Sequence, residues 1–383
     1  MDLLVLCAEA PTVAHPRPHG LIAALARRGH SVTLLFADEA GTTFDDLAEH
    51  CRQMLPVRRR RLAAAARAEA ANGAYDLAHV DGPAAGLLGD RPGLPCVLDL
   101  ATCGSLRRAR AVGFLGPIAR LTHLVTLPAR RRAEAALVAR FSRVIVATNE
   151  DAAALRRLGK GGDERSNIHV VPSTIDTERF APPTSLRDPA TLLLDLRELS
   201  RAEARAALGA VSSTMPLIWA QRADIRLTVL GPLPFGAAVP LSGDPRVVFT
   251  GPVHDPRGHL GSATLALAPF GPAASAPHAA LEALATGTAL VAGTALARDL
   301  AAAPGLELAT ADTPRQIAAT ALALLDNPPY RGQLGRAGRR LVERHHSWER
   351  AVASLEEVYG AATGAPLAEW RLEVGMDRPR PSE

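Results

Sequence analysis

Residues 264–294, TLALAPFGPAASAPHAALEALATGTALVAGT, contain the pattern that decides the fold. The apolar run 264–268 has the length of a buried strand and ends at a proline. Pro277 suits the first position of a helix, because an N–H group at that position has no partner inside the helix. Gly287 suits the left-handed residue that follows a helix, and a second apolar run begins at Leu290. The order strand, loop, helix, strand is typical of a parallel sheet, in which ligands bind at the carboxyl ends of the strands.

Two polar side chains share one face of this expected helix, which spans residues 278–286. His278 and Glu282 are four residues apart, and residues at that spacing are neighbours on a helix surface. They lie near the free N–H groups and the positive dipole end of the helix, which together bind anions. A diphosphate bound there would leave Glu282 to accept hydrogen bonds from ribose hydroxyls. In the alternative interpretation, Glu282 only complements the helix dipole and His278 is a solvated residue at the helix start.

The sequence around Glu282 resembles a block found in a known enzyme family. Residues 282–291, EALATGTALV, are similar to the block E-A-M-A-x-G-x-P-V-V of family-four-like glycosyltransferases with the GT-B fold. The resemblance implies that Glu282 binds the ribose of a nucleotide sugar donor, as the family's glutamate at this place does. It places Pro277 beside Glu282 among the expected donor-binding residues and makes His278 a candidate catalytic residue.

Further short sequence motifs that resemble those of the same family occur in the same order between residues 3 and 359. They are RGHSV at 28–32, YDLAHV at 75–80, VIVATNE at 144–150, IHVVPSTID at 168–176, RVVFTGPV at 246–253 and SW at 347–348. RVVFTGPV resembles V-x-F-T-G-x-V, after which the family's backbone contacts the nucleobase, so Gly251 and Val253 are expected donor-binding residues. Within the family, the chain looks closest to the sugar transferases linked to exopolysaccharide or exosortase loci, whose sites read G-x-Q-N-K-x-L-E-A-M-A.

The resemblance implies an α/β chain of the GT-B fold, with two Rossmann-like parallel-sheet domains that face each other across a cleft. In this fold the C-terminal helix crosses back to the first domain. The expected parts are an N-terminal acceptor domain at 1–182, a linker at 183–189, a nucleotide sugar donor domain at 190–345, a crossover helix at 346–362 and a tail at 363–383. Prolines at both ends of the linker support this division.

Asp99 lies at the carboxyl end of an expected strand, 96–100, where polar side chains of a parallel sheet meet ligands. Relatives place a histidine or aspartate near this point to contact the transferred sugar, so the resemblance makes Asp99 a candidate catalytic residue. A carboxylate that caps the next loop is the alternative.

Arg197 is the expected ligand of the donor diphosphate. The family has an arginine and a lysine after the first strand of the second domain, whereas this chain has DLRE at 195–198 and no lysine there. Arg197 or Arg201 would replace them. In two further departures, Ala274 stands where the family has a second glutamate, and Ala279 stands where the subgroup has its lysine. Both alanines bear on whether the enzyme is active.

The expected function is that of a retaining glycosyltransferase, which moves a sugar from a nucleotide diphosphate sugar to an acceptor hydroxyl on a polysaccharide, a lipid-linked molecule or a small molecule. The departing diphosphate needs electrostatic stabilisation, because charge develops on it in the transition state. No Asp-x-Asp pattern occurs, so we expect no metal ion and no other cofactor. A catalytically silent GT-B partner subunit and a nucleotide sugar epimerase are the alternatives. No motif identifies the donor sugar or the acceptor.

Length and composition fit a protein of two domains. The chain has 383 residues, of which 48% are hydrophobic and 4% aromatic, so a large core of small aliphatic side chains can form. The four cysteines have no metal-ligand spacing, which indicates free thiols in a reducing cytosol. No apolar run reaches the ~18 residues that span a bilayer, and the N-terminus lacks the basic region of a signal peptide. The formal net charge of +4 predicts mild attraction to anionic partners, and nucleic acid is not an expected partner.

Residues 106–140 are strongly basic and contain apolar patches. The arginines are Arg107, Arg108, Arg110, Arg120, Arg130, Arg131, Arg132 and Arg140. A basic amphipathic surface from Arg107 to Arg140 would bind an anionic membrane, which suits the lipid-linked acceptors of many relatives. A solvated helix face is the alternative. We therefore expect a cytoplasmic protein that is either free or peripheral at the inner face of the membrane.

Overall fold

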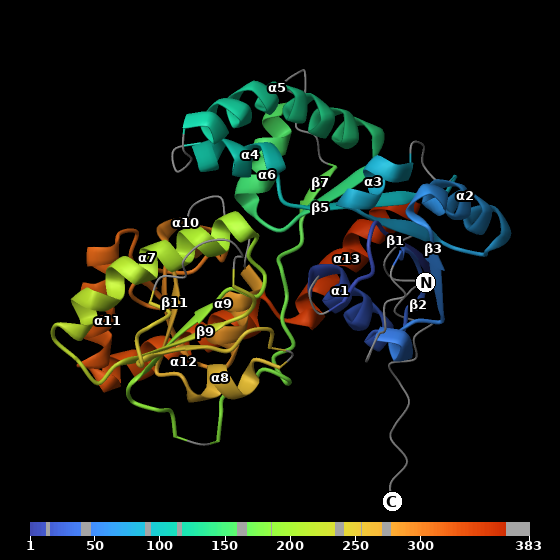
Figure 1. Cartoon of the computed structure of the whole chain (residues 1–383). Helices are drawn as coiled ribbons and strands as arrows, with labels where there is room; N and C mark the ends of the chain where they lie inside the picture. Colours follow the sequence, from blue (N-terminus) through green and yellow to red (C-terminus); the bar gives the residue numbers. More distant parts are fainter. Residues whose placement is uncertain are drawn as a thin grey trace, which may run out of the picture. The chain divides into compact units, whose positions relative to one another are not determined.

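The computed structural model describes residues 1–12, 16–39, 47–88, 93–112, 117–158, 167–184, 186–233, 241–253, 255–269 and 277–364. The chain folds into two compact units, and Figure 1 labels many of their helices and strands. The first unit comprises Met1–Cys103, Ala129–Pro172 and the chain from Trp348, and the second comprises Gly104–Pro128 and Ser173–Ser347. A domain division at the expected linker, 183–189, stays a prediction.

Seven parallel strands form the sheet of the first unit, in the order β3-β2-β1-β4-β5-β6-β7. The strands are β1 (Asp2–Cys7), β2 (Ser31–Ala37), β3 (Gln53–Val57), β4 (Leu77–Asp81), β5 (Cys96–Ala101), β6 (Arg143–Val146) and β7 (Ile168–Val170). The helices of this unit are α1 (Pro16–Arg27), α2 (Leu62–Asn72), α3 (Gly82–Leu88), α6 (Asn149–Leu158) and α13 (Trp348–Thr363). Helix α5 (Pro117–Arg140) contributes residues to both units.

The strand order of this sheet reverses beside β1, which pairs with β2 on one side and with β4 on the other. Leu3 of β1 is fully buried and lies in register with Val32 and Leu77. Ligands of open parallel sheets bind outside the carboxyl ends of the strands at such a reversal. The carboxyl ends of β1 and β4 are Cys7 and Asp81, so these residues mark the ligand side of the sheet.

The C-terminal helix α13 packs against α1, which confirms the expected return of the chain to its first part. Leu355 and Tyr359 of α13 are fully buried in a core that α1 and β1 also line. Beside this core, Arg28 Nε donates a hydrogen bond to Glu356 Oε1 at 3.1 Å. The expected tail from residue 363 lies almost entirely outside the described residues.

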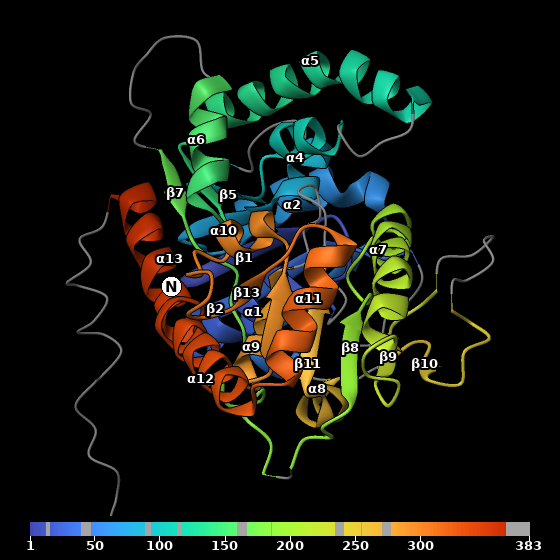
Figure 2. The ribbon, with the colours of Figure 1, turned by 90° about the vertical axis from the view of Figure 1, so that its left-hand side faces the viewer.

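Six parallel strands form the sheet of the second unit, in the order β10-β9-β8-β11-β12-β13. The strands are β8 (Thr191–Asp195), β9 (Arg226–Leu230), β10 (Val247–Phe249), β11 (Leu265–Ala268), β12 (Ala289–Ala292) and β13 (Ala309–Thr310). The helices are α4 (Gly104–Ala111), α7 (Arg201–Trp219), α8 (Arg257–Ser262), α9 (Pro277–Ala285), α10 (Thr294–Asp299), α11 (Pro314–Leu325) and α12 (Pro328–His345). Helices α7 and α11 contact each other extensively, as Figure 2 shows. Two parallel sheets with helices confirm the expected α/β class.

The stretch with the deciding sequence pattern folds as expected. Strands β11 and β12 pair in parallel over their whole length, and α9 connects them. Gly287 has a φ of 69° and follows the helix. The N–H groups of Gly287 and Thr288 donate to the carbonyls of Leu284 and Ala283, both at 2.9 Å. This Schellman arrangement ends a helix with a left-handed glycine, which confirms the interpretation of Gly287.

Arg187 fixes the segment in which the sequence indicates a linker. Its guanidinium donates to the carbonyls of Leu260 at 2.9 Å and Thr286 at 2.5 Å, and to the hydroxyl of Thr288 at 2.7 Å. Burial lowers the pKa of Arg187 to about 10, so the side chain is still charged at pH 7. The segment is therefore bonded to the second unit.

The edge strand β3 had no signal in the sequence. None of its residues is fully buried, and it contains Pro56. Proline is tolerated at a sheet edge, where its missing N–H leaves no ladder bond unmade. Pairing with β2, rather than hydrophobic periodicity, defines this strand.

Candidate active site

A guanidinium shared by two carboxylates lies at the carboxyl end of β8. Arg197 Nε is 3.1 Å from both carboxylate oxygens of Asp195, and its Nη2 is 2.6 Å from Asp195 Oδ2. The same Nη2 donates to Glu282 Oε2 on α9. The order of the second sheet reverses beside β8, which pairs with β9 and β11, so the cluster lies where ligands of such sheets bind. The structure thus brings together two expected donor-binding residues, Arg197 and Glu282.

Glu282 and His278 are both buried, with exposed fractions of 7% and 5%. The alternative interpretation of His278 as a solvated residue is therefore wrong, and Glu282 does more than complement the helix dipole. Burial raises the pKa of Glu282 to about 7, although the nearby charge of Arg197 acts in the opposite direction. Glu282 is therefore close to its titration midpoint at neutral pH.

Glu198, three residues after Asp195, adds a third carboxyl group that interacts with Glu282, Asp195 and Arg197. Burial, followed by the negative charges of Glu282 and Asp195, raises the pKa of Glu198 to about 8. Three carboxyl groups therefore interact with Arg197.

One glycine, Gly231, brings backbone close to Arg197, and a second, Gly251, is bonded to it. Gly231 follows β9 with a φ of 101°, and a Cβ atom there would lie 2.9 Å from Arg197 N, so only glycine fits. The N–H of Gly231 donates to the carbonyl of Gly251 at 3.0 Å. Gly251 follows β10, and Val253, two residues later, packs partly buried against the core. The expected donor-binding residues Gly251 and Val253 therefore come after the carboxyl end of a strand of this sheet, as Arg197 does.

Pro277 is the first residue of α9, as the sequence indicates. Because proline has no N–H, the free N–H groups of this helix begin at His278. Ala279, which replaces the subgroup's lysine, is buried in the first turn. Ala274, which replaces the family's other glutamate, lies outside the residues that the structure describes.

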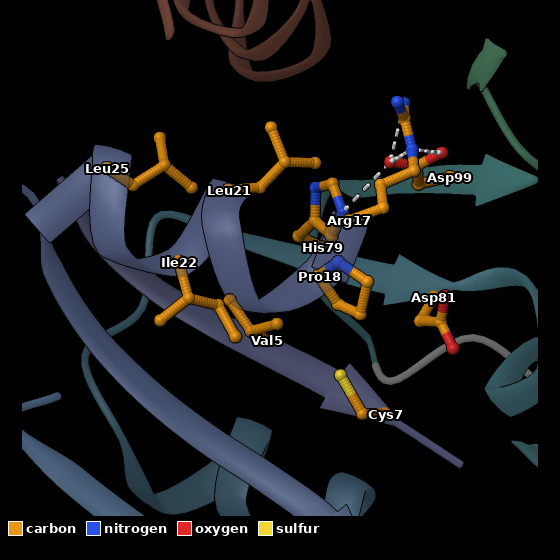
Figure 3. A pocket seen from close by; sticks show the side chains of 10 residues that line it. All are labelled: Val5, Cys7, Arg17, Pro18, Leu21, Ile22, Leu25, His79, Asp81 and Asp99. Atoms are coloured by element: carbon orange, nitrogen blue, oxygen red, sulfur yellow. Dashed lines mark hydrogen bonds and ion pairs between the residues drawn. The ribbon is translucent and has the colours of Figure 1, made fainter. Parts of the chain in front are cut away.

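In the first unit, a second arginine holds Asp99 (Figure 3). Arg17 Nε lies 3.2 and 3.0 Å from the two carboxylate oxygens of Asp99, and Arg17 Nη2 is 3.0 Å from Oδ2. Asp99 Oδ1 also accepts the N–H of Ala101 at 2.9 Å, where the backbone has a φ of 56°. Asp99 therefore caps the following loop, as the alternative interpretation has it, while it is bound to Arg17. Its catalytic function stays a prediction, as does the expected cleft position opposite Glu282.

A buried series of polar groups leads from α13 to Asp99. Tyr359 Oη is 2.8 Å from His79 Nδ1, and His79 Nε2 is 3.8 Å from Asp99 Oδ2. Burial lowers the pKa of His79, so its ring is neutral at pH 7. A neutral ring that turns Nε2 toward a carboxylate carries its proton on Nε2, and Tyr359 then donates to Nδ1. Helix α13 thus sets the tautomer of the histidine beside Asp99.

Asp81 and Cys7, at neighbouring strand ends, contribute to the pocket in Figure 3. The other residues that line the pocket are Val5, Arg17, Pro18, Leu21, Ile22, Leu25, His79 and Asp99. Asp81 and Asp99 are in register on the neighbouring strands β4 and β5. Burial, and then the charge of Asp99, raises the pKa of Asp81 to about 7. The first unit therefore holds a carboxyl group that titrates near neutral pH beside an ion-paired one.

Several residues of these clusters had not been assigned to a site from the sequence. They are Arg17, His79, Asp81, Asp195, Glu198 and Tyr359. Asp81 and Asp195 each end a parallel strand, so the rule that selected Asp99 would have selected them too. Arg17 and Tyr359 carry no such signal, because their partners lie 82 and 280 residues away in the chain.

The basic region does not form one continuous surface. Arg107 Nη1 lies 2.5 Å from Asp299 Oδ2, and Arg110 Nη1 lies 3.6 Å from Asp299 Oδ1. The two arginine side chains are only 12% and 13% exposed. The expectation that the membrane surface begins at Arg107 is therefore wrong, because these guanidinium groups are turned toward α10.

Three further expectations concern membranes, metals and thiols. Within the described ranges, no helix combines the length and the apolar character needed to cross a bilayer. The described side chains also include no group of three His, Cys, Asp or Glu residues that could hold a metal ion. The cysteines Cys7, Cys51, Cys96 and Cys103 are free thiols.

Two family models match successive parts of the chain. The model described as Glycosyltransferase Family 4 matches residues 19–179, and the model described as Glycosyl transferases group 1 matches residues 199–327. No curated protein matches the chain in sequence.

Solved structures of similar fold cover nearly the whole chain. Sucrose-phosphate synthase from Thermosynechococcus elongatus is 18% identical with a TM-score of 0.72, over 96% of this chain and 100% of that one. HepE from Anabaena, solved with UDP and glucose, is 15% identical with a TM-score of 0.70, over 94% and 100%. WaaG, a glycosyltransferase involved in lipopolysaccharide biosynthesis, is 16% identical with a TM-score of 0.64, over 94% and 100%. At these identities the likeness shows the fold, which is the expected GT-B type.

Proposed function

We propose a donor site and an acceptor site for this chain, which belongs to the group 1 and family 4 glycosyltransferases and transfers a sugar from a nucleotide diphosphate sugar with retention of configuration. The observation that carries the donor site is Arg197, held between Asp195 and Glu282 at the carboxyl end of β8. A diphosphate at this point meets both a guanidinium and the free N–H groups of α9. Donor binding is assigned to Arg197, Glu282, Gly251, Val253 and Pro277.

The chemistry of transfer assigns a separate task to each side chain of the cluster. Charge develops on the diphosphate as its bond to the sugar breaks, and Arg197 stabilises that charge. Glu282 exchanges its contact with Arg197 for hydrogen bonds from the ribose hydroxyls. His278, buried one turn before Glu282, is the candidate catalytic residue of this unit. The HepE structures contain UDP or UDP-glucose, which supports a uridine diphosphate sugar as the donor here.

Binding of the acceptor is assigned to the first unit. Asp99 is fixed by Arg17 and by the N–H of Ala101, so its carboxylate has a defined position at the carboxyl end of β5, and we assign it the contact with the transferred sugar. The sequence motifs resemble those of transferases linked to exopolysaccharide loci. We therefore propose a saccharide or a lipid-linked saccharide as the acceptor. We place the enzyme in the cytoplasm and assign it no metal cofactor.

Donor binding tests the proposal directly. UDP-, GDP- and ADP-sugars are compared by the thermal shift that they produce, because a ligand bound only by the native state raises the melting temperature. We expect the largest shift with a UDP-sugar, and the release of UDP only when a saccharide acceptor is also present. Interconversion of free nucleotide sugars would instead indicate an epimerase. Failure of every nucleotide sugar to bind would contradict the proposed donor site and favour a silent partner subunit, which the departures at Ala274 and Ala279 allow.

A peripheral membrane contact through α5 is a second proposal. Leu121, Leu124 and Val125 follow helical spacing and are 63%, 47% and 69% exposed, and Arg120 is exposed beside them. An apolar stripe with adjacent positive charge matches the surface of an anionic bilayer.

Vesicle flotation distinguishes this surface from a solvated helix face. The protein is expected to float with vesicles that contain anionic lipid and to be released as salt rises, because salt screens the attraction. Leu121→Ser with Val125→Ser should abolish flotation, whereas Arg107→Gln should not, because Arg107 is turned toward Asp299. Equal flotation with neutral and anionic vesicles would contradict the proposal.

A further inference from the structure

A run of four arginines, residues 58–61, follows β3 and belongs to neither of the clusters described above. Strand β3 ends at Val57 and lies in the same parallel sheet as β4 and β5. The carboxyl ends of parallel strands face one side of a sheet, on which ligands bind. The arginines therefore lie on the same side of the first sheet as Asp81 and Asp99, in the unit to which the acceptor is assigned.

An open hollow of about 470 Å³ lies beside these arginines. It is lined by Arg58, Arg59 and Arg60, by Glu39 after the end of β2, and by Leu87 of α3. Its volume lies within the range of roughly 300–1,000 Å³ that is typical of sites for small molecules. Three guanidinium groups and one carboxylate give this lining a formal charge of +2.

The protein itself neutralises only part of this charge. Arg59 is tied to two carboxylates, because its N–H donates to Glu39 Oε1 at 2.9 Å and its Nη1 lies 3.8 Å from Glu9 Oε1. Within the described part of the chain, the guanidinium groups of Arg58 and Arg60 have no hydrogen bond or ion pair, and both residues are exposed. Two positive charges at the hollow are therefore available to a ligand.

The stability of the fold does not explain these charges. Residues 59–61 form a short 3-10 turn that leads into α2, so the arginines lie at the N-terminal end of that helix. Positive side chains at this end repel the helix dipole. Helix α2 has no acidic residue in its first turn to compensate, and Arg61 at its N-cap makes no side-chain capping bond. A bound anion would reduce this repulsion, whereas folding alone gains nothing from the run.

We propose that Arg58 and Arg60 bind an acidic group of the acceptor, which makes the acceptor a saccharide that carries a carboxylate or a phosphate. A guanidinium group presents paired N–H donors that match two oxygens of either group. Glu39 can accept hydrogen bonds from hydroxyls of the same saccharide. The concave shape favours a saccharide over a membrane surface as the ligand. The inference rests on the proposed function, which assigns the acceptor to this unit, and it adds the charge of that acceptor.

The test measures binding of saccharide probes to the UDP-saturated protein by isothermal titration calorimetry, so that UDP keeps the probes out of the donor site. An oligogalacturonate tests the carboxylate, glucose 6-phosphate tests the phosphate, and a neutral maltooligosaccharide is the reference. Wild type should bind one of the acidic probes more tightly than the neutral one, and this preference should decrease as salt rises. Arg58→Gln with Arg60→Gln should raise the Kd of that acidic probe about tenfold, as expected for two exposed ion pairs. The Kd of the neutral probe should not change.

Arg130→Gln with Arg131→Gln is the matched control, because it removes two neighbouring exposed charges from α5 in the same unit. This variant should bind the acidic probe as wild type does. If wild type binds neither acidic probe, or if the Arg58 and Arg60 variant binds it equally well, the inference is overturned while the donor site stands. Loss of flotation with anionic vesicles in that variant would also overturn it, because the arginines would then bind a membrane. Failure of UDP to bind, measured before the probes are added, would instead contradict the donor site.

Discussion

The two units each place an arginine and a carboxylate at the point where the strand order reverses, but their charges differ. Arg17 holds one carboxylate, Asp99, and the next polar groups are a neutral histidine and a tyrosine. Arg197 is shared by Asp195 and Glu282, with Glu198 close by. The first cluster has one arginine for Asp99 and Asp81, whereas the second has one arginine for three carboxyl groups.

This difference indicates what each cluster can do without a ligand. The Arg17–Asp99 pair has matched charges, so it can keep its geometry in the empty protein and position Asp99. The Arg197 cluster holds carboxyl groups whose pKa values are raised by burial, to about 7 for Glu282 and about 8 for Glu198. Small changes of charge, such as the arrival of a diphosphate, therefore change its protonation. The first cluster is suited to positioning, and the second to a change of protonation when a ligand binds.

Replacement of each arginine should give the largest difference between the two clusters in stability and UDP binding. Arg197→Met leaves Asp195 and Glu282 without their cation, and loss of one partner of a buried ion pair costs about 3–5 kcal/mol. We expect a loss of this size in the free energy of unfolding at pH 8, measured with urea, together with loss of detectable UDP binding. Arg17→Met should also destabilise the protein but should leave the Kd for UDP unchanged. Equal loss of UDP binding in both variants would contradict the separate functions of the clusters.

Glu282→Ala tests the carboxylate that contacts both Arg197 and the proposed ribose. A hydrogen bond to a charged group contributes roughly 1.5–3 kcal/mol, so the Kd for UDP should rise by about ten- to a hundredfold. Stability should fall less than in Arg197→Met, because Arg197 keeps its bonds to Asp195. Calorimetric titration with UDP measures the first effect, and urea unfolding measures the second. An unchanged Kd would remove Glu282 from the donor site.

Tyr359→Phe changes only the cluster of the first unit. The substitution removes the O–H that donates to His79 Nδ1 and leaves that buried nitrogen without a donor, which costs about 1–3 kcal/mol. Because the tautomer of His79 is then free to change, we expect turnover with a saccharide acceptor to fall while the Kd for UDP stays the same. If Tyr359 has only a structural function, the substitution will lower stability and leave turnover per folded molecule unchanged.

The fold could be predicted to a large extent because its signals are local. The strand, helix and strand within residues 264–294 are specified by apolar runs of fixed length, by Pro277 and by Gly287. Each of these signals acts on residues within a few positions, so tertiary contacts are not needed to interpret them. Strand β3 was missed for the opposite reason, since its exposed edge position leaves no apolar period in the sequence.

The same distinction holds for the candidate sites. The sequence by itself determined that Glu282 lies one turn after the start of a helix, and that Asp99 and Arg197 follow buried strands. Only the tertiary structure decided that Arg197 contacts Glu282, 85 residues away, and that Arg17 contacts Asp99, 82 residues away. The physical reason is that these contacts depend on which strands are neighbours in each sheet, and strand order is set by the packing of the whole unit rather than by any short stretch of the chain.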